Sequence, residues 1–380
     1  MEIGLAMIRH RNPSGPVLNP LTLLTRPNRT LPPPLDSPTA SFHPYGRVAL
    51  LEGLRILHIK PGDNVLVPSF ICASVIAPFN KLDIDVRYYE VDDQLQPRYD
   101  TAARILDSRT KAFLGVHYFG FPQDVEAIRD FCEEYGLYYI EDNSHGLLSA
   151  LGSRSLGTFG DISVFSQRKT LALPHGGALV VNRPNLLPHD RILSTCPPMR
   201  GEPSAFRFLL RSLTLNLDIF PYLDIEAFLR RFARDRAGAP LAGQENSLDD
   251  YLEADSRLAR WILMRADFGR EKRVRCLGFT FWCKVFGNSR TEEFSPVFDD
   301  LPHGVVPLGF PIRVRRRMNF IDELNRQGIR CFPWPARPST APVTPLNSEI
   351  AVIPLHPTAL HFTHALYNDP SRILKPQRGI

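Results

Sequence analysis

Short apolar runs alternate with longer amphipathic segments from about residue 46 to residue 183. A short apolar run bounded by Gly, Pro or Asp is typical of a buried strand, whereas apolar residues spaced three and four apart indicate a helix that buries one face. These patterns predict six strands, at Asn64–Pro68, Asp85–Val91, Lys111–His117, Gly136–Ile140, Ile162–Phe165 and Ala178–Val181.

Helices are predicted between these strands, around residues 71–81, 98–107 and 123–135. In the third of them, the four residues Val125, Ile128, Phe131 and Cys132 fall on one face. Strands that alternate with helices of this length pair in parallel through right-handed crossovers. We therefore predict an α/β fold, a mostly parallel sheet flanked by helices, with its ligand site at the carboxyl ends of the strands.

The second half of the chain follows a different pattern. Residues 184–250 hold long apolar stretches without a clear period and give no prediction. A long helix is predicted from about Asp249 to Leu277, followed by strands at Thr280–Val285 and Gly309–Val314, a helix over residues 317–327 and a closing strand. Such a mixture indicates a smaller α+β domain at the C-terminal end.

Eight prolines stand between residues 13 and 38, among them Pro32, Pro33 and Pro34. Proline lacks a backbone donor and fixes φ, so this segment is predicted to be an extended arm, which either wraps a partner subunit or remains a disordered tail. Three parts follow from these patterns: an arm over residues 1–40, a large domain over residues 41–250 and a small domain over residues 251–380.

Composition narrows the class of protein. With 380 residues and 43% hydrophobic content, the chain can bury one large and one smaller core. A net charge of +5 over this length does not favour nucleic-acid binding. The six cysteines form no C-x-x-C pair, so no zinc or other metal site is expected, and their number fits a reducing compartment. No apolar signal core and no membrane-spanning stretch is found, and we expect a cytoplasmic protein that does not contact a membrane.

Candidate catalytic residues gather where the predicted strands end. Asp142 follows the strand Gly136–Ile140, His145 stands three residues later, and Lys169 follows the strand Ile162–Phe165 after Ser166. Pyridoxal phosphate requires a lysine amine to form a Schiff base and a carboxylate against its pyridine nitrogen. It also requires backbone amides, preferably at a helix N-terminus, for its phosphate. Gly46-Arg47, which open a predicted helix after Pro44, can supply these amides.

Five motifs in this order resemble the sugar aminotransferase family DegT/DnrJ/EryC1/StrS. The motifs run from residue 46 to about residue 181: Gly46-Arg-Val-Ala-Leu50, Pro61-Gly-Asp-Asn-Val65 with Pro68-Ser-Phe70, Val116-His-Tyr-Phe-Gly120, Glu141-Asp-Asn-Ser-His145, and Gly157 through Ser166. The resemblance implies the fold of type I pyridoxal-phosphate enzymes and a homodimer. It also implies ping-pong transfer of an amino group, usually from glutamate, to a ketone on a nucleotide-linked sugar or a similar cyclic ketone.

The resemblance also implies roles for single residues. Lys169 would form the Schiff base and shuttle the proton at the substrate α-carbon, Asp142 would pair with the pyridine nitrogen, and His145 would lie against the cofactor ring. The phosphate would be held by Ser166 and by the amides of Gly46 and Arg47.

Several positions depart from the family pattern. Lys169 stands three residues after Ser166 rather than five, Cys72 replaces an aromatic residue, and Arg47 replaces a threonine. The segment with which the family reaches the partner's phosphate is not found, and Asn246 is only a guess for that role. These departures keep two alternatives open. One is a pyridoxal-phosphate enzyme with another reaction, such as dehydration or aromatisation of an aminocyclohexadienone; the other is a non-catalytic binding or regulatory protein of the same fold.

Four further residues have an ordinary structural interpretation beside a functional one. His117 and His356 are interpreted as structural, whereas His175 and Arg168 lie in the lysine loop and are candidates for substrate contact. The basic run from Arg313 to Arg317 either attracts an anionic ligand or is a solvated junction between a strand and a helix.

Overall fold

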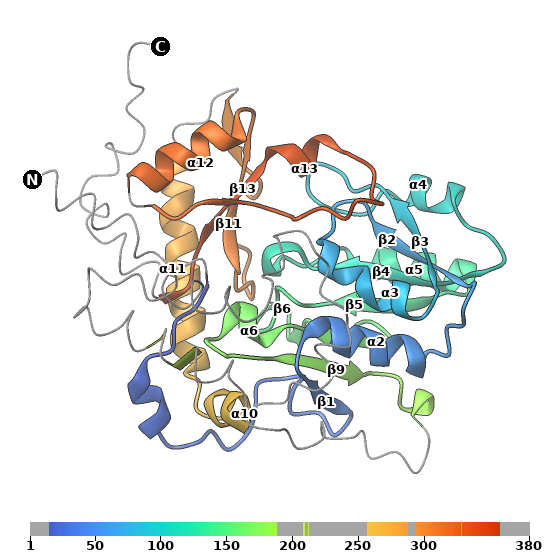
Figure 1. Ribbon diagram of the computed structural model, residues 1–380, viewed down its shortest axis with the longest axis horizontal. Helices are drawn as coiled ribbons and strands as arrows, with labels where there is room; N and C mark the ends of the chain where they lie inside the picture. The colour runs from blue at the N-terminus through green and yellow to red at the C-terminus, as the bar shows by residue number, and fades with distance from the viewer. Residues whose placement is uncertain are drawn as a thin grey trace, which may run out of the picture.

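Two sheets organise the chain, and the computed structural model describes them over residues 15–187, 208–209, 212, 257–287, 293–327 and 329–357 (Figure 1). Seven strands form the larger sheet in the order β1-β9-β8-β5-β4-β2-β3, and four strands form the second in the order β10-β11-β13-β12. The predicted α/β fold with a smaller α+β part is confirmed. The predicted boundary near residue 250 lies outside the described residues.

The larger sheet is mostly parallel. Its strands are β1 (Ala40–His43), β2 (Asn64–Pro68), β3 (Asp85–Tyr89), β4 (Thr110–Val116), β5 (Tyr138–Asp142), β8 (Ile162–Phe165) and β9 (Gly177–Val181). Strands β3, β2, β4, β5 and β8 pair in parallel, whereas β9 runs antiparallel to β8 and β1 antiparallel to β9. All six predicted strands are present, with β5 starting two residues later than expected and β3 ending two residues earlier.

Helices cover both faces of this sheet. Helix α2 (Gly46–Ile56) packs against β8 and β9, where a Cβ on Gly53 would stand 2.5 Å from the Ile162 side chain. Helix α5 (Val125–Tyr135) packs against the other face, where a Cβ on Gly115 would stand 3.0 Å from Ile128. The four residues predicted for the buried face of α5 are the four that it buries.

Alternation along β5 separates two acidic residues at its end. Tyr139 lies on the α5 face beside Gly115, and Ile140 pairs in register with Ile162 on the α2 face. Successive side chains of a strand point to opposite faces, so Glu141 belongs to the α5 face and Asp142 to the α2 face.

Shorter helices connect the remaining strands. The predicted helix over residues 71–81 is divided into the 3₁₀ turn η2 (Ala73–Val75) and α3 (Ala77–Lys81). Pro78 lacks an N–H group and favours the first turn of a new helix over the continuation of an old one. The remaining short elements are α4 (Tyr99–Arg104), η3 (Tyr118–Gly120), the small hairpin β6 (Ala150–Leu151) and β7 (Arg154–Ser155), α6 (Gln167–Thr170) and η4 (Pro184–Leu186).

The second sheet is antiparallel and is accompanied by the helices of the C-terminal part. Its strands are β10 (Phe294–Pro296), β11 (Gly309–Val314), β12 (Phe332–Pro333) and β13 (Ile350–Pro354), and its helices are α10 (Arg257–Leu263), α11 (Phe268–Gly287), α12 (Arg317–Arg326) and α13 (Pro345–Glu349). The predicted strand Gly309–Val314, the helix over 317–327 and the closing strand are confirmed.

Two predictions for this part are wrong. Thr280–Val285 is not a strand but the second half of α11, because Phe279, Trp282 and Phe286 are buried at helical spacing. The single long helix from Asp249 to Leu277 is interrupted after Leu263, and α11 starts anew where the Asp267 carboxylate accepts from the Arg270 amide. Residues 249–256 lie outside the described part of the chain.

The described part of the N-terminal arm packs against its own chain. It contains the 3₁₀ turn η1 (Pro20–Leu24), and its residues Leu18 and Leu35 are buried in a cluster with Ile262 of α10. The Asn28 amide donates to the Met264 carbonyl at 2.6 Å. Contact of this arm with a partner subunit stays a prediction.

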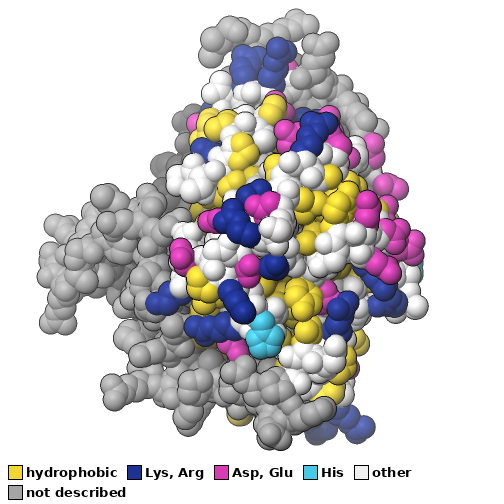
Figure 2. All heavy atoms as spheres, turned by 90° about the vertical axis from the view of Figure 1, so that its right-hand side faces the viewer, with side chains coloured by type: hydrophobic (Ala, Val, Ile, Leu, Met, Phe, Trp, Pro, Cys, Tyr) yellow, Lys and Arg dark blue, Asp and Glu magenta, His cyan; other side chains and the backbone are white. Residues whose placement is uncertain are grey.

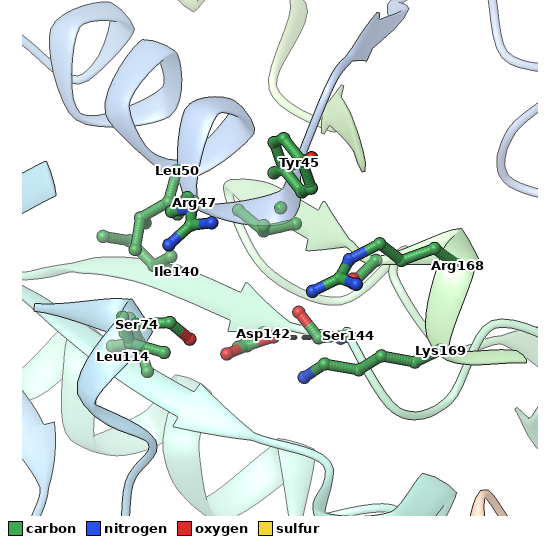
Figure 3. Close-up of a pocket in the computed structure, with 14 residues that line it drawn as sticks. Tyr45, Arg47, Leu50, Ser74, Leu114, Ile140, Asp142, Ser144, Arg168 and Lys169 are labelled. Carbon is green, nitrogen blue, oxygen red and sulfur yellow. Dashed lines mark hydrogen bonds between the residues drawn. The ribbon is translucent and has the colours of Figure 1, made fainter. Parts of the chain in front are cut away.

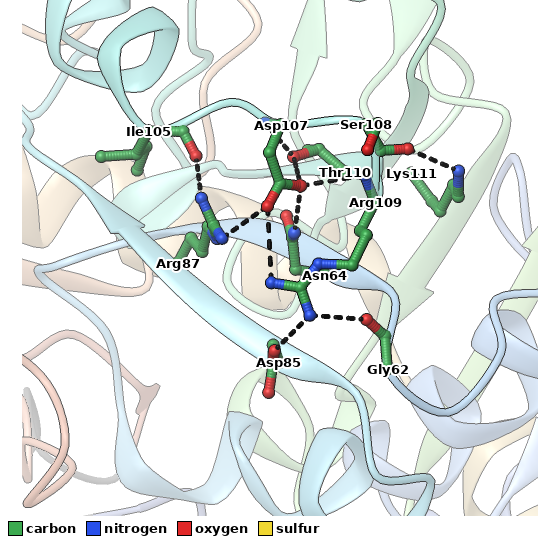
Figure 4. A network of polar contacts seen from close by, with 10 residues as sticks. All are labelled: Gly62, Asn64, Asp85, Arg87, Ile105, Asp107, Ser108, Arg109, Thr110 and Lys111. Carbon is green, nitrogen blue, oxygen red and sulfur yellow. Dashed lines mark hydrogen bonds and ion pairs between the residues drawn. The ribbon is translucent and has the colours of Figure 1, made fainter.

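A polar network fastens the amino-terminal ends of β2, β3 and β4 (Figure 4). Asp107 accepts from the Asn64 side chain at 2.8 Å and from Arg87 at 2.6 Å, and Arg109 reaches Asp85 and the Gly62 carbonyl. Basic and acidic side chains are also interspersed over the face of the molecule in Figure 2, where the described residues present no continuous patch of one sign. Within the described residues, no helix is long and apolar enough to cross a membrane.

Arg275 of α11 is a buried residue that connects the end of α6 with the segment just before β11. Its side chain is 1% exposed and donates to the carbonyl of Leu308 at 2.9 Å and to that of Thr170, at the end of α6, at 2.7 Å. Its charge is balanced by Glu271, one turn earlier on the same helix, at 3.4 Å.

We expect Arg275→Ala to lower the free energy of unfolding by about 3–5 kcal/mol, because it leaves the Glu271 charge and two carbonyls without their partner. Arg273→Ala, which removes an exposed arginine from the same helix, should change it by less than about 0.5 kcal/mol. Urea denaturation of the three proteins measures both values. Equal stabilities for the two variants would contradict the role given to Arg275.

Candidate functional site

A pocket opens at the carboxyl ends of β4, β5 and β8, on the α2 face of the larger sheet (Figure 3). It encloses about 640 Å³, counting the space open to solvent. The lining residues are Tyr45, Gly46, Arg47, Leu50, Ser74, Val75, Leu114, Ile140, Asp142, Ser144, Val164, Ser166, Arg168 and Lys169. Five of the six predicted site residues are thus together: Gly46, Arg47, Asp142, Ser166 and Lys169. The sixth, His145, is not among the residues that line the pocket.

Asp142 ends β5 with its carboxylate at the floor of the pocket. Its side chain is 6% exposed, and Oδ1 accepts from the Ser144 amide at 2.9 Å. The carboxylate turns toward the same space as the Lys169 amine (Figure 3). The pocket therefore presents an acid and an amine to one ligand.

Lys169 extends into this space from α6, a single helical turn that follows β8 (Figure 3). Its amide donates to the Ser166 carbonyl at 3.0 Å. Burial lowers the pKa of Lys169 below its ordinary value; the charges of Asp142 and Cys72 oppose this shift, and Arg168 adds to it. A lysine with a lowered pKa is more often neutral, which is the form that attacks a carbonyl carbon.

The N-terminus of α2 forms the opposite wall. Val48 and Ala49 donate to the Tyr45 carbonyl, so the amides of Gly46 and Arg47 precede the first helical hydrogen bonds, and both residues line the pocket. The helix dipole favours an anion at this end. Gly46 suits the close packing here, since a Cβ at this position would stand 3.1 Å from the Phe165 carbonyl oxygen, a tight contact.

Tyr45, just before this helix, holds two arginines at the pocket wall. The guanidinium carbons of Arg47 and Arg168 lie 5.1 and 5.3 Å from the centre of its ring. The Tyr45 hydroxyl lies 2.9 Å from Nδ1 of His175, whose ring meets that of Tyr45 edge-on. His175 thus supports Tyr45. Tyr45 was not predicted as a site residue. The one signal in the sequence that could have indicated it is its position directly before Gly46.

His145 is buried beside the pocket. Its Nδ1 accepts from the Phe119 amide at 3.1 Å, and its ring packs against those of Phe119 and Trp334 at 5.7 and 5.3 Å. Burial lowers the pKa of His145 well below its ordinary value, and the charge of Lys169 lowers it further. His145 is therefore a neutral imidazole with its proton on Nε2. Trp334, which follows β12 in the second sheet, was not found from the sequence.

Glu141, on the other face of β5, is the buried centre of a hydrogen-bond network. Its carboxylate accepts from Phe159 and Gly160 amides at 2.8 and 2.9 Å, from the Ser163 hydroxyl at 3.0 Å and also from the Gly157 amide. Burial alone would raise the pKa of Glu141. The hydrogen bond and charge of His117, with the amides of Gly160 and Gly157, lower the pKa overall.

His117 completes this network. It is buried, its Nδ1 accepts from the Gln123 amide at 3.0 Å, and its Nε2 donates to Glu141 at 2.9 Å. The structural interpretation of His117 is confirmed. Glu141, near the end of β5, is thus connected to the end of β4 through His117 and to β8 through Ser163. Only the folded chain reveals this role.

Comparison with known proteins agrees with this geometry. Residues 45–205 match the model of the DegT/DnrJ/EryC1/StrS aminotransferase family. GDP-perosamine synthase of Vibrio cholerae is 34% identical over 160 residues, 41% of this chain and 42% of that protein. The dTDP-4-dehydro-2,3,6-trideoxy-D-glucose 4-aminotransferase of Saccharopolyspora spinosa is 34% identical over 166 residues, 42% of each chain. The matched region thus spans less than half the length of these relatives.

The fold extends over more of the chain than the sequence similarity. Helicobacter pylori PseC, an aminotransferase involved in the biosynthesis of pseudoaminic acid, superimposes with a TM-score of 0.63 at 16% identity, covering 98% of this chain and 96% of that one. DesV of S. venezuelae gives a TM-score of 0.59 at 20% identity, covering 98% and 95%. These structures establish the fold of the chain.

We expect Glu141→Gln to lower the free energy of unfolding by about 3–5 kcal/mol at pH 7, because an amide cannot accept from so many donors. The pKa of Glu141 is lowered in the folded state, so its ionised form stabilises the protein above its ordinary pKa of 4.5, and this contribution is lost as the pH falls further. The difference between wild type and variant should therefore shrink in denaturation experiments below pH 4.5. Glu133→Gln, on the exposed side of α5, is the control and should show no such difference.

We expect His145 to remain neutral at pH 6, with the proton on Nε2. The ¹⁵N chemical shifts of its ring report both the charge and the tautomer, and His145→Gln identifies its signals. Titration of His145 at its ordinary pKa of 6.5 would show that its surroundings are more open to water than the structure indicates.

Proposed function

We propose that this chain, whose residues 45–205 match the model of the DegT/DnrJ/EryC1/StrS aminotransferase family, is a pyridoxal-phosphate-dependent aminotransferase. It takes an amino group from a donor such as glutamate and transfers it to a keto group of a nucleotide-linked sugar. The observation that carries this proposal is the arrangement of one pocket: the Lys169 amine, the Asp142 carboxylate and the open N-terminus of α2 all line it.

The donor set of the pocket fits pyridoxal phosphate. Lys169 would hold the aldehyde carbon, Asp142 the pyridine nitrogen, and the amides of Gly46 and Arg47 with the Ser166 hydroxyl the phosphate. Close packing supports this assignment, because it brings the start of α2 next to Ser166: a Cβ on Gly46 would stand 3.4 Å from the Cβ of Ser166. When bound, the cofactor supplies an electron sink for the bonds at the carbon that carries the amino group.

The residues of the chain then have separate tasks. Asp142 keeps a proton on the ring nitrogen, since a carboxylate beside a basic nitrogen favours its charged form. With the cofactor bound, Lys169 Nζ, whose pKa is lowered by burial, would accept the proton of the substrate α-carbon and give it back later in the transfer. His145 is neutral and is packed by Phe119 and Trp334, so it contributes uncharged, buried packing beside the pocket rather than a charge.

The wider assembly is part of the proposal. We propose the division into an arm over residues 1–40, a large domain over 41–250 and a small domain over 251–380. The position of β1 at Ala40–His43, on the edge of the larger sheet, supports the first boundary. The resemblance to the family supports a homodimer.

Purified protein should absorb visible light through a covalent link between Lys169 and the cofactor, and borohydride should make this link permanent. Mass spectrometry of a digest should locate the reduced adduct on Lys169. Lys169→Ala should lose both the absorbance and the adduct, whereas Lys60→Ala, which removes an exposed lysine, should keep them. An adduct that persists in Lys169→Ala would refute the assignment. L-glutamate should bleach the visible band of wild type, and failure of every amino donor to do so would exclude transamination.

A further inference from the structure

Arg168 precedes Lys169 directly and lines the same pocket. Its side chain is exposed, and its guanidinium is held 5.3 Å from the centre of the Tyr45 ring. In Figure 3 the guanidinium extends over the pocket on the side of the Lys169 amine. Contact with a ring orients the guanidinium of an arginine, and the planar fork of this group suits the two oxygens of a carboxylate.

We propose that Arg168 binds the α-carboxylate of the amino donor and thereby selects α-amino acids as donors. This inference rests on the proposed function. The carbon of an α-carboxylate is bonded to the carbon that bears the amino group, so this carboxylate must lie close to Lys169 whenever the donor reacts there.

The two arginines of the pocket lie next to different groups and therefore suit different anions. Arg47 belongs to the N-terminus of α2, where the helix amides already attract the phosphate. Arg168 belongs to α6, where its side chain is more exposed than that of Lys169. The diphosphate of a nucleotide-linked sugar is separated from the reacting ketone by several bonds, so a cation next to Lys169 suits the donor carboxylate better.

The test follows the donor half-reaction of the holoenzyme by its visible absorbance, at increasing donor concentration. We expect Arg168→Gln to raise the apparent dissociation constant about 10- to 100-fold for both L-glutamate and L-glutamine, because both carry an α-carboxylate. Arg168→Lys, which keeps the charge without the fork, should give a smaller increase. Arg154→Gln is the matched control, since Arg154 is also exposed and stacks on an aromatic ring, 4.3 Å from that of Phe159, but lies outside the pocket.

Three results would overturn the proposal. Unchanged donor affinity in Arg168→Gln would remove any role in donor binding, and a loss confined to L-glutamate would assign Arg168 to the side-chain carboxylate. Weaker binding of pyridoxal phosphate or of the nucleotide-linked sugar, with donor affinity intact, would assign it to a phosphate. Each of these results leaves the Lys169 adduct in place. Absence of that adduct from wild type would instead refute the proposed function together with this inference.

Discussion

The buried carboxylate of Glu141 is the interaction on which the geometry of the site depends. It accepts hydrogen bonds from His117 beyond β4, from Ser163 on β8 and from three amides of the loop between residues 157 and 160. A buried charge is tolerated only when its hydrogen bonds are satisfied, so the ends of three strands must meet at one point. Asp142, the next residue, is thereby fixed on the opposite face with its carboxylate in the pocket.

The pocket balances positive groups against one acid. Lys169, Arg47, Arg168 and the N-terminus of α2 surround Asp142, which suits a ligand that carries a phosphate and reacts with anionic substrates. Crowding also lowers the pKa of Lys169, because burial disfavours its charged form. The charge of Arg168 adds to this lowering of the pKa, whereas the charge of Asp142 opposes it.

The second sheet takes part in the site although none of its residues lines the pocket. Arg275 of α11 holds the Thr170 carbonyl, next to Lys169, and Trp334 packs against His145, Phe119 and Phe70. The positions of Lys169 and His145 therefore depend on how the C-terminal part packs.

The sequence by itself determined six of the seven strands of the larger sheet, with β1 as the one it did not predict, the buried face of α5 and five of the residues that line the pocket. These features follow from local patterns: apolar periodicity, glycines at close contacts, and polar residues at strand ends. Tertiary structure decided what depends on distant partners. Thr280–Val285 became helix because Trp282 is buried on one helical face together with Phe279 and Phe286, and His145 was enclosed by a tryptophan almost 190 residues away along the chain. Glu141 has its role because the loop between residues 157 and 160 supplies donors to it, and Tyr45 has its role because two arginines lie over its ring. No local sequence pattern predicts either set of contacts, because each set includes partners from other parts of the chain.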